Sequence, residues 1–190
     1  LFNTNTIPWA VLFMTLLRTG LMASTMQFYL YSKRKDLFSV LFGCMYALSS
    51  YVICYQNNVM WFDALILLPL IVYGLECLID GKPGTLYAIS LGVAIFSNYY
   101  IGYMLCIFSV IYFVGYFFLK NKGFKDAKKI FIKFAFHSII AGGLSAVMTL
   151  PTIYNLGLSS NKHMADLSSL IDLRPVFSYI EFLQYFMAGS

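Results

Sequence analysis

Residues 63–79 read DALILLPLIVYGLECLI, an apolar run close to the length that crosses a lipid bilayer. A helix needs about 20 predominantly apolar residues to span the hydrocarbon core. Backbone N–H and C=O groups in lipid must be satisfied internally, and this continuous run lacks the alternation of the ~10-residue strands of a membrane barrel. The stretch therefore predicts a transmembrane helix.

Further apolar runs lie on both sides of this one. Together they predict six spans, at residues 8–32, 37–54, 63–79, 85–97, 101–119 and 130–150. The composition agrees, because 60% of the residues are apolar, 11% are charged and the mean hydropathy is +0.75. Too few charged residues are present to coat a soluble domain. We expect an all-α polytopic bundle.

The domain organisation follows from the same runs. We expect a transmembrane helical domain in residues 1–150, and an extracytoplasmic segment in residues 151–190 with an interfacial helix near residues 175–187. The chain opens LFNTNTIPW, without an early basic residue typical of a signal sequence. We expect at least one more span before Leu1, because the orientation predicted by the basic residues puts the N-terminus outside. We also expect more protein after Ser190, because the apolar, aromatic stretch at 175–187 does not resemble a terminus.

The basic residues predict the orientation. Lysine and arginine gather after the first, third and fifth runs, and the positive-inside rule makes those connections cytoplasmic. The residues concerned are Lys33, Arg34, Lys35, Lys82, Lys120, Lys122, Lys125, Lys128, Lys129 and Lys133. The connections at 56–62 and 98–100, and the tail from 151, are then extracytoplasmic.

The run at 85–97 is shorter than a full span. It could be a tilted helix, or one arm of a broken hairpin with the run at 101–119. Asn98 would lie at the extracytoplasmic interface in the first arrangement and within the membrane in the second. The sequence leaves both open.

Polar and aromatic side chains cluster before the central run. The cluster consists of Gln56, Asn57, Asn58, Trp61 and Asp63. The amides can exchange hydrogen bonds with sugar hydroxyls, the indole offers an apolar face to a pyranose ring, and the carboxylate can act as a base or a metal ligand. Alternatively, the indole anchors the interface, the asparagines form a turn and the carboxylate caps the helix.

Two further positions are candidates for binding. Asn98, Tyr99 and Tyr100 adjoin the kink between two runs, where they could hold a sugar or simply pack at the interface. Arg18 lies deep in the first run, so it needs a partner, either a lipid phosphate or an acid in a preceding segment. Glu76 and His137 lie nearer the cytoplasmic ends, where snorkelling or helix–helix hydrogen bonds would satisfy them.

Other site types find little support. Cysteines 44, 54, 77 and 106 stand singly in apolar runs, as small buried hydrophobes would, without the spacing of a zinc site. The basic stretch at 120–129 is typical of a cytoplasmic connection, so we expect no nucleic-acid partner. No cofactor is identified, although Asp63 could contribute to binding a divalent cation.

Two stretches carry a family resemblance. Residues 46–82, YALSSYVICYQNNVMWFDALILLPLIVYGLECLIDGK, and residues 97–113, SNYYIGYMLCIFSVIYF, closely resemble the bacterial YfhO membrane-protein family. The most specific parts are residues 55–70 and 97–104, and the rest matches mainly as hydrophobic pattern. The resemblance implies a GT-C-type glycosyltransferase, which transfers a sugar from a polyprenyl-phosphate donor to lipoteichoic acid or a similar surface polymer.

The resemblance also implies roles for residues. The principal catalytic aspartate of such enzymes would precede Leu1, so that this fragment would be inactive alone and Asp63 would be a second, assisting carboxylate. Arg18 stands where we would expect a lysine, and could steady the lipid phosphate. Two alternatives remain: a transporter or flippase of lipid-linked sugars, and a structural component of envelope assembly.

Overall fold

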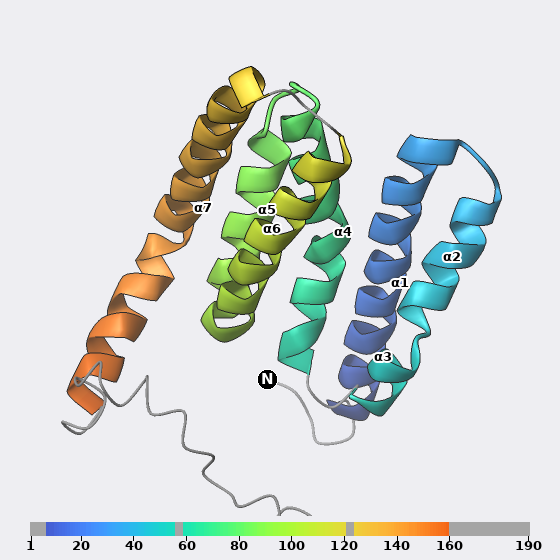
Figure 1. The fold of residues 1–190 in the computed structure, drawn as a ribbon. Helices are drawn as coiled ribbons and strands as arrows, with labels where there is room; N and C mark the ends of the chain where they lie inside the picture. The colour runs from blue at the N-terminus through green and yellow to red at the C-terminus, as the bar shows by residue number, and fades with distance from the viewer. Residues whose placement is uncertain (1–6, 56–58, 121–123, 160–190) are drawn as a thin grey trace, which may run out of the picture. The chain divides into compact units, whose positions relative to one another are not determined.

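The computed structural model describes residues 7–55, 59–120 and 124–159. Every regular element in these residues is a helix, which confirms the all-α prediction. The helices are α1 (Ile7–Arg34), α2 (Phe38–Ala47), α3 (Ser50–Cys54), α4 (Val59–Ile79), α5 (Thr85–Ser97), α6 (Tyr99–Leu119) and α7 (Phe124–Ser159) (Figure 1). The contacts divide the chain into two units, Leu1–Leu150 and Pro151–Ser190. The interfacial helix predicted at 175–187 lies outside the described residues.

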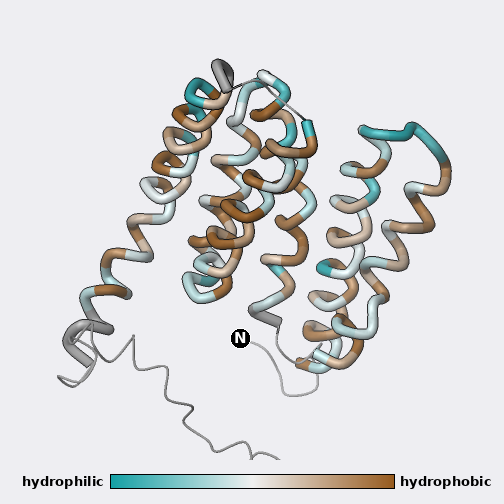
Figure 2. The backbone as a smooth tube through the Cα atoms, in the orientation of Figure 1, coloured by the Kyte–Doolittle hydropathy of each residue, from teal (hydrophilic) through white to brown (hydrophobic). Residues whose placement is uncertain are grey.

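Four helices are long and apolar enough to cross a membrane. They comprise Ile7–Arg34, Trp61–Ile79, Tyr99–Leu119 and Ala127–Tyr154, and two shorter apolar segments accompany them, Phe38–Cys54 and Thr85–Ser97. Hydrophobic residues run along the helices and hydrophilic ones gather at their ends in Figure 2. The six predicted spans thus correspond to helical segments, four of full length and two shorter.

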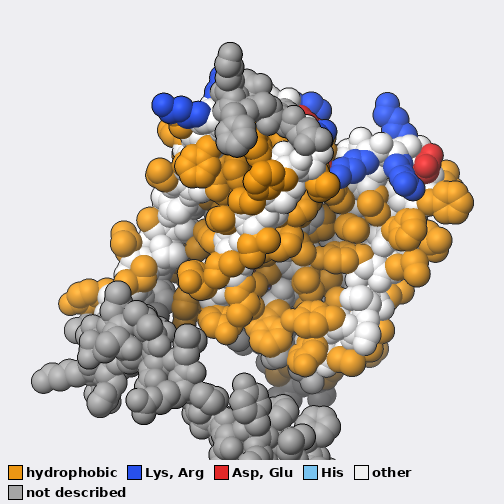
Figure 3. All heavy atoms as spheres, in the orientation of Figure 1, with side chains coloured by type: hydrophobic (Ala, Val, Ile, Leu, Met, Phe, Trp, Pro, Cys, Tyr) orange, Lys and Arg blue, Asp and Glu red, His pale blue; other side chains and the backbone are white. Residues whose placement is uncertain are grey.

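The surface of the first unit suits a lipid surrounding. The large side chains of Trp9, Leu37 and Val147 are 72%, 90% and 75% exposed, and hydrophobic atoms cover most of the face seen in Figure 3. Soluble monomers rarely expose so continuous an apolar surface. Two of the cysteines expected to be buried, Cys44 and Cys54, are exposed on this surface, and that expectation was wrong for them.

The predicted span at 37–54 is not one helix. Leu48 has left the helical region, with φ −100° and ψ 20°, and Ser49 is extended, with φ −61° and ψ 151°, so that α2 ends before α3 begins. Serine side chains compete for backbone hydrogen bonds and favour helix ends over helix interiors. Ser49 and Ser50 lie at the break, in line with this preference, although the Ser49 side chain makes no cap hydrogen bond.

Two prolines lie inside helices. The predicted span ends at residue 150, and the helix α7 itself continues through Pro151 to Ser159. Pro69 lies inside α4, where its missing N–H leaves the carbonyl of Leu65, four residues earlier, without its helical donor. The Tyr46 hydroxyl of α2 donates to that Leu65 oxygen at 2.8 Å. A neighbouring helix therefore satisfies the carbonyl that Pro69 leaves open, as transmembrane helices require.

The main core lies around α5. Tyr87 and Leu91 of α5 are 1% and 2% exposed, and pack with buried residues of α4, α6 and α7. Glycines allow the helices to approach closely, since a Cβ on Gly74 would lie 2.5 Å from the backbone nitrogen of Tyr87, and one on Gly102 would lie 2.6 Å from the Cα of Ile95. Small residues at such crossings are the usual means of packing membrane helices.

The close approach of Gly74 to Tyr87 fixes the level of Asn98. The helices α4 and α5 run antiparallel, and Gly74 of α4 lies against Tyr87 of α5. Asp63 lies 11 residues before Gly74, and Asn98 lies 11 residues after Tyr87. Asn98 and Asp63 are therefore near the same level along the bundle. The 21 residues of α6, which begins at Tyr99, extend about 31 Å, which is long enough to cross a membrane; the depth of Asn98 in the membrane stays a prediction.

A second, smaller core joins α1 to the helices from α2 to α4. It contains Met22, Ala47, Val52 and Phe62. Lysine and arginine side chains occur along one end of the unit in Figure 3, including over the last turn of α1 and the start of α2. Lys33 and Arg34 occupy that last turn of α1. We call this end of the unit the basic end. The α5–α6 turn and the start of α4 lie at the opposite end (Figure 1).

Candidate functional site

Arg18 and Asp63 form an ion pair between α1 and α4. The Arg18 Nε lies 3.4 Å from the Asp63 Oδ1, and the two side chains are 24% and 32% exposed. The sequence indicated that Arg18 needs a partner and offered a lipid phosphate or an acid before Leu1. The structure instead supplies Asp63, which was itself a candidate site residue.

Asp63 does not cap its helix. Because α4 begins at Val59, Asp63 lies in the second turn, and the cap interpretation is wrong. Its neighbours Phe62 and Ala64 are 1% and 7% exposed, so the carboxylate emerges between two packed side chains. A charge in this environment is stabilised by a partner on an adjacent helix, and Arg18 supplies it.

The pair lies toward the end of the bundle opposite the basic end. Arg18 and Asp63 are in contact, as are Lys33 and Glu76, so α1 and α4 run parallel and side by side. The rise of α1 between Arg18 and Lys33 is about 22 Å, against a hydrocarbon core of ~30 Å. Arg18 thus lies well away from the basic end but still within the apolar helix Ile7–Arg34, where Asp63 supplies the partner that a charge in an apolar span needs.

Trp61, in the first turn of α4, packs with the rings of Tyr51 and Tyr55. Trp61 packs against Tyr51 with ring centroids 6.4 Å apart and against Tyr55 at 5.8 Å, while the two tyrosines are 5.0 Å apart. Tyr51 and Tyr55 are 43% and 47% exposed. The rings offer an apolar platform at the same end as the Arg18–Asp63 pair, and also the anchoring that interfacial aromatic residues provide.

Asn98 has a structural task in the α5–α6 turn. Its Oδ1 accepts hydrogen bonds from the backbone N–H groups of Tyr100 at 3.0 Å and Ile101 at 3.3 Å, and so caps α6. Tyr99 and Tyr100 in the first turn are 49% and 56% exposed. Sugar binding by these three residues stays a prediction.

The predicted site residues are thus only partly assembled. The structure brings Arg18 and Asp63 into contact and places Trp61 half a turn away on the same helix. Asn98 lies near the same level at another helix junction. Gln56, Asn57 and Asn58 lie outside the described residues.

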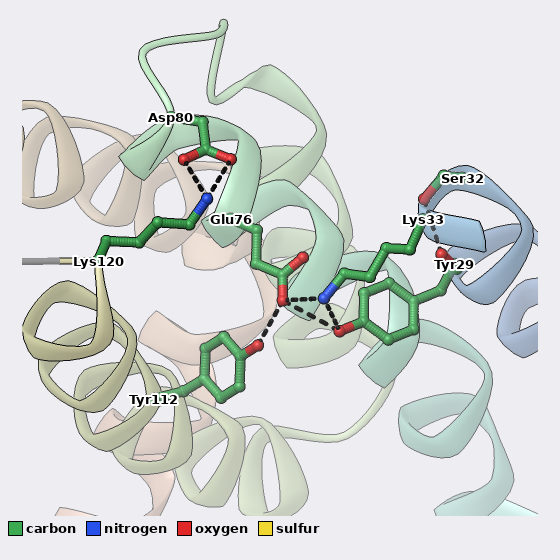
Figure 4. Close-up of polar contacts among 7 residues, drawn as sticks. All are labelled: Tyr29, Ser32, Lys33, Glu76, Asp80, Tyr112 and Lys120. Carbon is green, nitrogen blue, oxygen red and sulfur yellow. Dashed lines mark hydrogen bonds and ion pairs between the residues drawn. The ribbon is translucent and has the colours of Figure 1, made fainter.

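A second polar cluster surrounds Glu76, for which the sequence left snorkelling and helix–helix hydrogen bonding open. Glu76 of α4 is 5% exposed, and its Oε1 accepts hydrogen bonds from Lys33 at 2.7 Å, Tyr29 at 3.0 Å and Tyr112 at 2.6 Å. Figure 4 shows these side chains converging from α1 and α6. Helix–helix hydrogen bonding, one of the two interpretations of Glu76, is what the structure shows.

One feature of the sequence indicated this cluster, namely the single acid Glu76 within an apolar run. It could not indicate the partners, which come from helices far apart in the chain. Tyr29 and Lys33 are one turn apart on α1, and the Lys33 Nζ also donates to the Tyr29 hydroxyl at 2.8 Å. The cluster fastens α1 to α4 and α6.

The remaining charged contacts lie at the basic end. Lys120, just after α6, approaches Asp80 at 3.1 Å, and this hydrogen-bonded partner raises the pKa of Lys120 above its ordinary value. Such exposed pairs contribute little to stability. His137 bonds within its own helix, with Nδ1 2.8 Å from the carbonyl oxygen of Lys133.

The described residues do not fit a divalent-metal site at Asp63. No three His, Cys, Asp or Glu side chains gather anywhere in the described part of the chain. Arg18 lies against the Asp63 carboxylate, and its positive charge would repel a second cation at the same oxygen atoms. Asp63 is better suited to hydrogen-bonding a neutral hydroxyl.

Comparison with known families yields one match. The family model described as bacterial membrane protein YfhO matches residues 1–190, the whole chain. Neither the curated proteins nor the solved structures contain a match. The resemblance carried by the two quoted stretches is therefore confirmed.

Proposed function

The chain belongs to the YfhO family of bacterial membrane proteins, and from this membership we propose that it is part of a membrane glycosyltransferase of GT-C type. The observation that carries the proposal is the Arg18–Asp63 pair, at 3.4 Å. It sets a cation and a carboxylate side by side on neighbouring helices, toward the end of the bundle opposite the basic end. A phosphate-bearing donor and a hydroxyl acceptor need that combination of groups.

The proposed donor is a sugar linked to polyprenyl phosphate. Such a lipid keeps its isoprenoid chain in the bilayer while its phosphate and sugar lie at the boundary. Arg18 matches the phosphate, because a guanidinium is planar, always charged and suited to phosphate oxygen atoms. The exposed aromatic residues near Trp61 would pack against the sugar, with Asn98, Tyr99 and Tyr100 as further binding groups.

The proposed acceptor is a hydroxyl group of lipoteichoic acid or a similar extracytoplasmic polymer. Its oxygen attacks the anomeric carbon, a new carbon–oxygen bond forms, and the bond to the lipid phosphate breaks. Asp63 orients this hydroxyl by accepting its hydrogen bond. The proton passes to a principal catalytic aspartate that we expect outside residues 1–190, and the lipid phosphate leaves with the bonding electron pair.

The orientation that the proposal needs comes from the positive-inside rule. The basic end carries Lys33, Arg34, Lys82 and Lys120, so it is expected to be cytoplasmic. The Arg18–Asp63 pair then faces the outside, where nucleotide sugars are absent. A donor carried by a membrane lipid fits that location.

The test is the sugar content of lipoteichoic acid and other surface polymers in the source bacterium. A deletion strain is complemented with the wild-type gene, with Asp63→Asn, or with Asp80→Asn. Asp80 is the matched control, since it also pairs with a basic residue but lies at the basic end. Immunoblotting of membranes establishes that each variant is present at wild-type abundance.

We expect the deletion and Asp63→Asn strains to lose the sugar and the Asp80→Asn strain to retain it. A normal sugar content of the surface polymers in the Asp63→Asn strain would show that this carboxylate does not assist the transfer. Normal sugar on every surface polymer of the deletion strain would contradict the enzyme, and favour transport of lipid-linked sugars or a structural role in envelope assembly.

A further inference from the structure

A groove of about 680 Å³ runs between α1 and α2 at the basic end. Met26, Leu30 and Arg34 line it from α1, each about one turn from the next, and Phe38, Phe42 and Met45 line it from α2. Both sets follow helical spacing, so each forms one continuous wall. The groove is therefore a trough about 12 Å long, parallel to the helices.

The trough exists because α1 and α2 are in close contact beside it, through residues next to those that line the groove. A Cβ on Gly43 of α2 would lie 2.7 Å from the backbone oxygen of Ala23 and 3.2 Å from the Cβ of Gln27. This contact involves α1 residues adjacent to the groove wall. The larger Phe42 and Met45 lie on either side of Gly43, and they are 51% and 61% exposed.

The two ends of the trough differ chemically. Its membrane part is lined by aliphatic, aromatic and thioether side chains, and methionine adapts well to flexible apolar ligands. Its rim at the basic end carries Arg34 and Asp36. Figure 3 shows the same order, with charged side chains at this end of α1 and α2 and hydrophobic ones directly below them.

Charge at the rim defines the ligand further. Lys33, the neighbouring base, is engaged by Glu76, whereas Arg34 makes no ion pair within the described part of the chain. Arg34 and Asp36 line the rim, and Lys35 lies between them in the chain. The Arg34 guanidinium is suited to a phosphate group at this rim. Asp36, as a carboxylate, accepts hydrogen bonds from hydroxyl groups.

We propose that this groove binds one molecule of an anionic, hydroxyl-bearing phospholipid such as phosphatidylglycerol. An acyl chain lies along the apolar walls, the phosphate meets Arg34, and the glycerol headgroup donates to Asp36. The site is separate from the proposed transfer site, which lies at the opposite end of the bundle. Basic pockets between membrane helices are a recognised mode of anionic-lipid binding.

Native mass spectrometry of the purified full-length protein tests the site directly. The protein in detergent is titrated with phosphatidylglycerol, or with phosphatidylcholine of the same acyl chains. The variants are Arg34→Ala, which removes the phosphate contact, and Leu30→Trp, which fills the trough without changing charge. Lys82→Ala is the matched control, because it removes a positive charge from the same end outside the groove.

Wild-type protein should retain phosphatidylglycerol in preference to phosphatidylcholine. Arg34→Ala should weaken phosphatidylglycerol binding about fivefold, the ratio that corresponds to ~1 kcal/mol for one basic residue near anionic lipid. Leu30→Trp should abolish the tightest bound lipid, and Lys82→Ala should leave it in place.

Three outcomes would overturn the proposal. Equal retention of the two lipids would show that the rim does not select an anion. An equal loss of phosphatidylglycerol in Arg34→Ala and Lys82→Ala would show that general surface charge, and not the groove, determines binding. Unchanged binding in both groove variants would mean that the retained lipid binds outside the trough. A wild-type thermal stability of Arg34→Ala excludes misfolding as the cause of any loss.

Discussion

A single side chain, Tyr46, supplies a hydrogen bond that the backbone needs and that lipid cannot supply. Pro69 deprives the Leu65 carbonyl of its helical donor, and the Tyr46 hydroxyl replaces that donor at 2.8 Å. An unsatisfied backbone carbonyl in an apolar interior is costly. Tyr46 therefore stabilises α4 specifically because Pro69 interrupts it.

This coupling can be measured. Tyr46→Phe should lower the free energy of unfolding by about 1–2 kcal/mol, because it leaves the Leu65 carbonyl without a donor. In a Pro69→Ala background the residue at 69 regains its N–H, and the same Tyr46→Phe change should cost less than half as much. Unfolding in mixed detergent micelles, followed by circular dichroism, gives the four values of the cycle.

Tyr103→Phe is the control for that cycle, since this phenol is 67% exposed on α6 and its removal should change stability little in either background. Equal costs of Tyr46→Phe with and without Pro69 would contradict the proposed relation between the two residues.

Sequence patterns predicted which residues need partners but not which partners they find. Arg18 stood out as a charge inside an apolar run, and Asp63 as an acid at the start of another. Their contact depends on α1 and α4 being neighbours with a particular register, which no local pattern contains. The cap role of Asn98 was missed, although an asparagine immediately before a helix is a common cap.

At the scale of elements, α1 and α4 are joined by two ion pairs of the same polarity. Arg18 and Lys33 of α1 supply the cations, and Asp63 and Glu76 of α4 supply the anions. Along α4 the two anions are about 20 Å apart. The pairs fix both the parallel direction and the register of the two helices, and so hold Arg18 beside Asp63.

The Lys33–Glu76 pair should show measurable coupling. Lys33→Met leaves a buried carboxylate with only its phenol donors, and Glu76→Met leaves the ammonium and the Tyr112 hydroxyl without an acceptor. Each single change should destabilise the protein, and the double change should cost less than their sum. We expect a coupling of about 1 kcal/mol, near the lower part of the usual range, since the Lys33 side chain is 41% exposed.

A matching cycle on Lys120 and Asp80 provides the comparison, because that pair is exposed at the basic end. It should show no measurable coupling at physiological salt. Additive effects at Lys33 and Glu76 would mean that the cluster does not fasten α1 to α4.

Helix positions could be predicted from the sequence because length and hydropathy decide them in lipid. The helix boundaries differ at two places. The span expected at 37–54 breaks at Ser49 and Ser50, and α7 passes through Pro151, since a single proline need not end a membrane helix.

At the scale of the whole molecule, the orientation of the bundle in the membrane stays a prediction. It rests on the excess of lysine and arginine at the basic end. Single cysteines introduced at Lys82 and at Tyr99 into a variant lacking the four native cysteines allow a test. A membrane-impermeant maleimide added to intact cells should label position 99 and should label position 82 only after the cells are opened.

The reverse pattern, with position 82 labelled from outside, would invert the bundle and place the Arg18–Asp63 pair on the cytoplasmic side. That outcome would contradict a polyprenyl-phosphate donor acting outside the cell. It would leave the packing of the helices unchanged, because no contact within the bundle depends on the orientation.

The central claim is that Asp63 assists sugar transfer, and an assay in isolated membranes tests it most directly. Membranes containing the full-length protein are given lipoteichoic acid and radiolabelled polyprenyl-phosphate hexoses, tested one at a time, and transfer of label to polymer is followed. We predict transfer by the wild type and by Asp80→Asn, and a rate about 100-fold lower for Asp63→Asn at equal abundance. Transfer at the wild-type rate by Asp63→Asn would contradict the account.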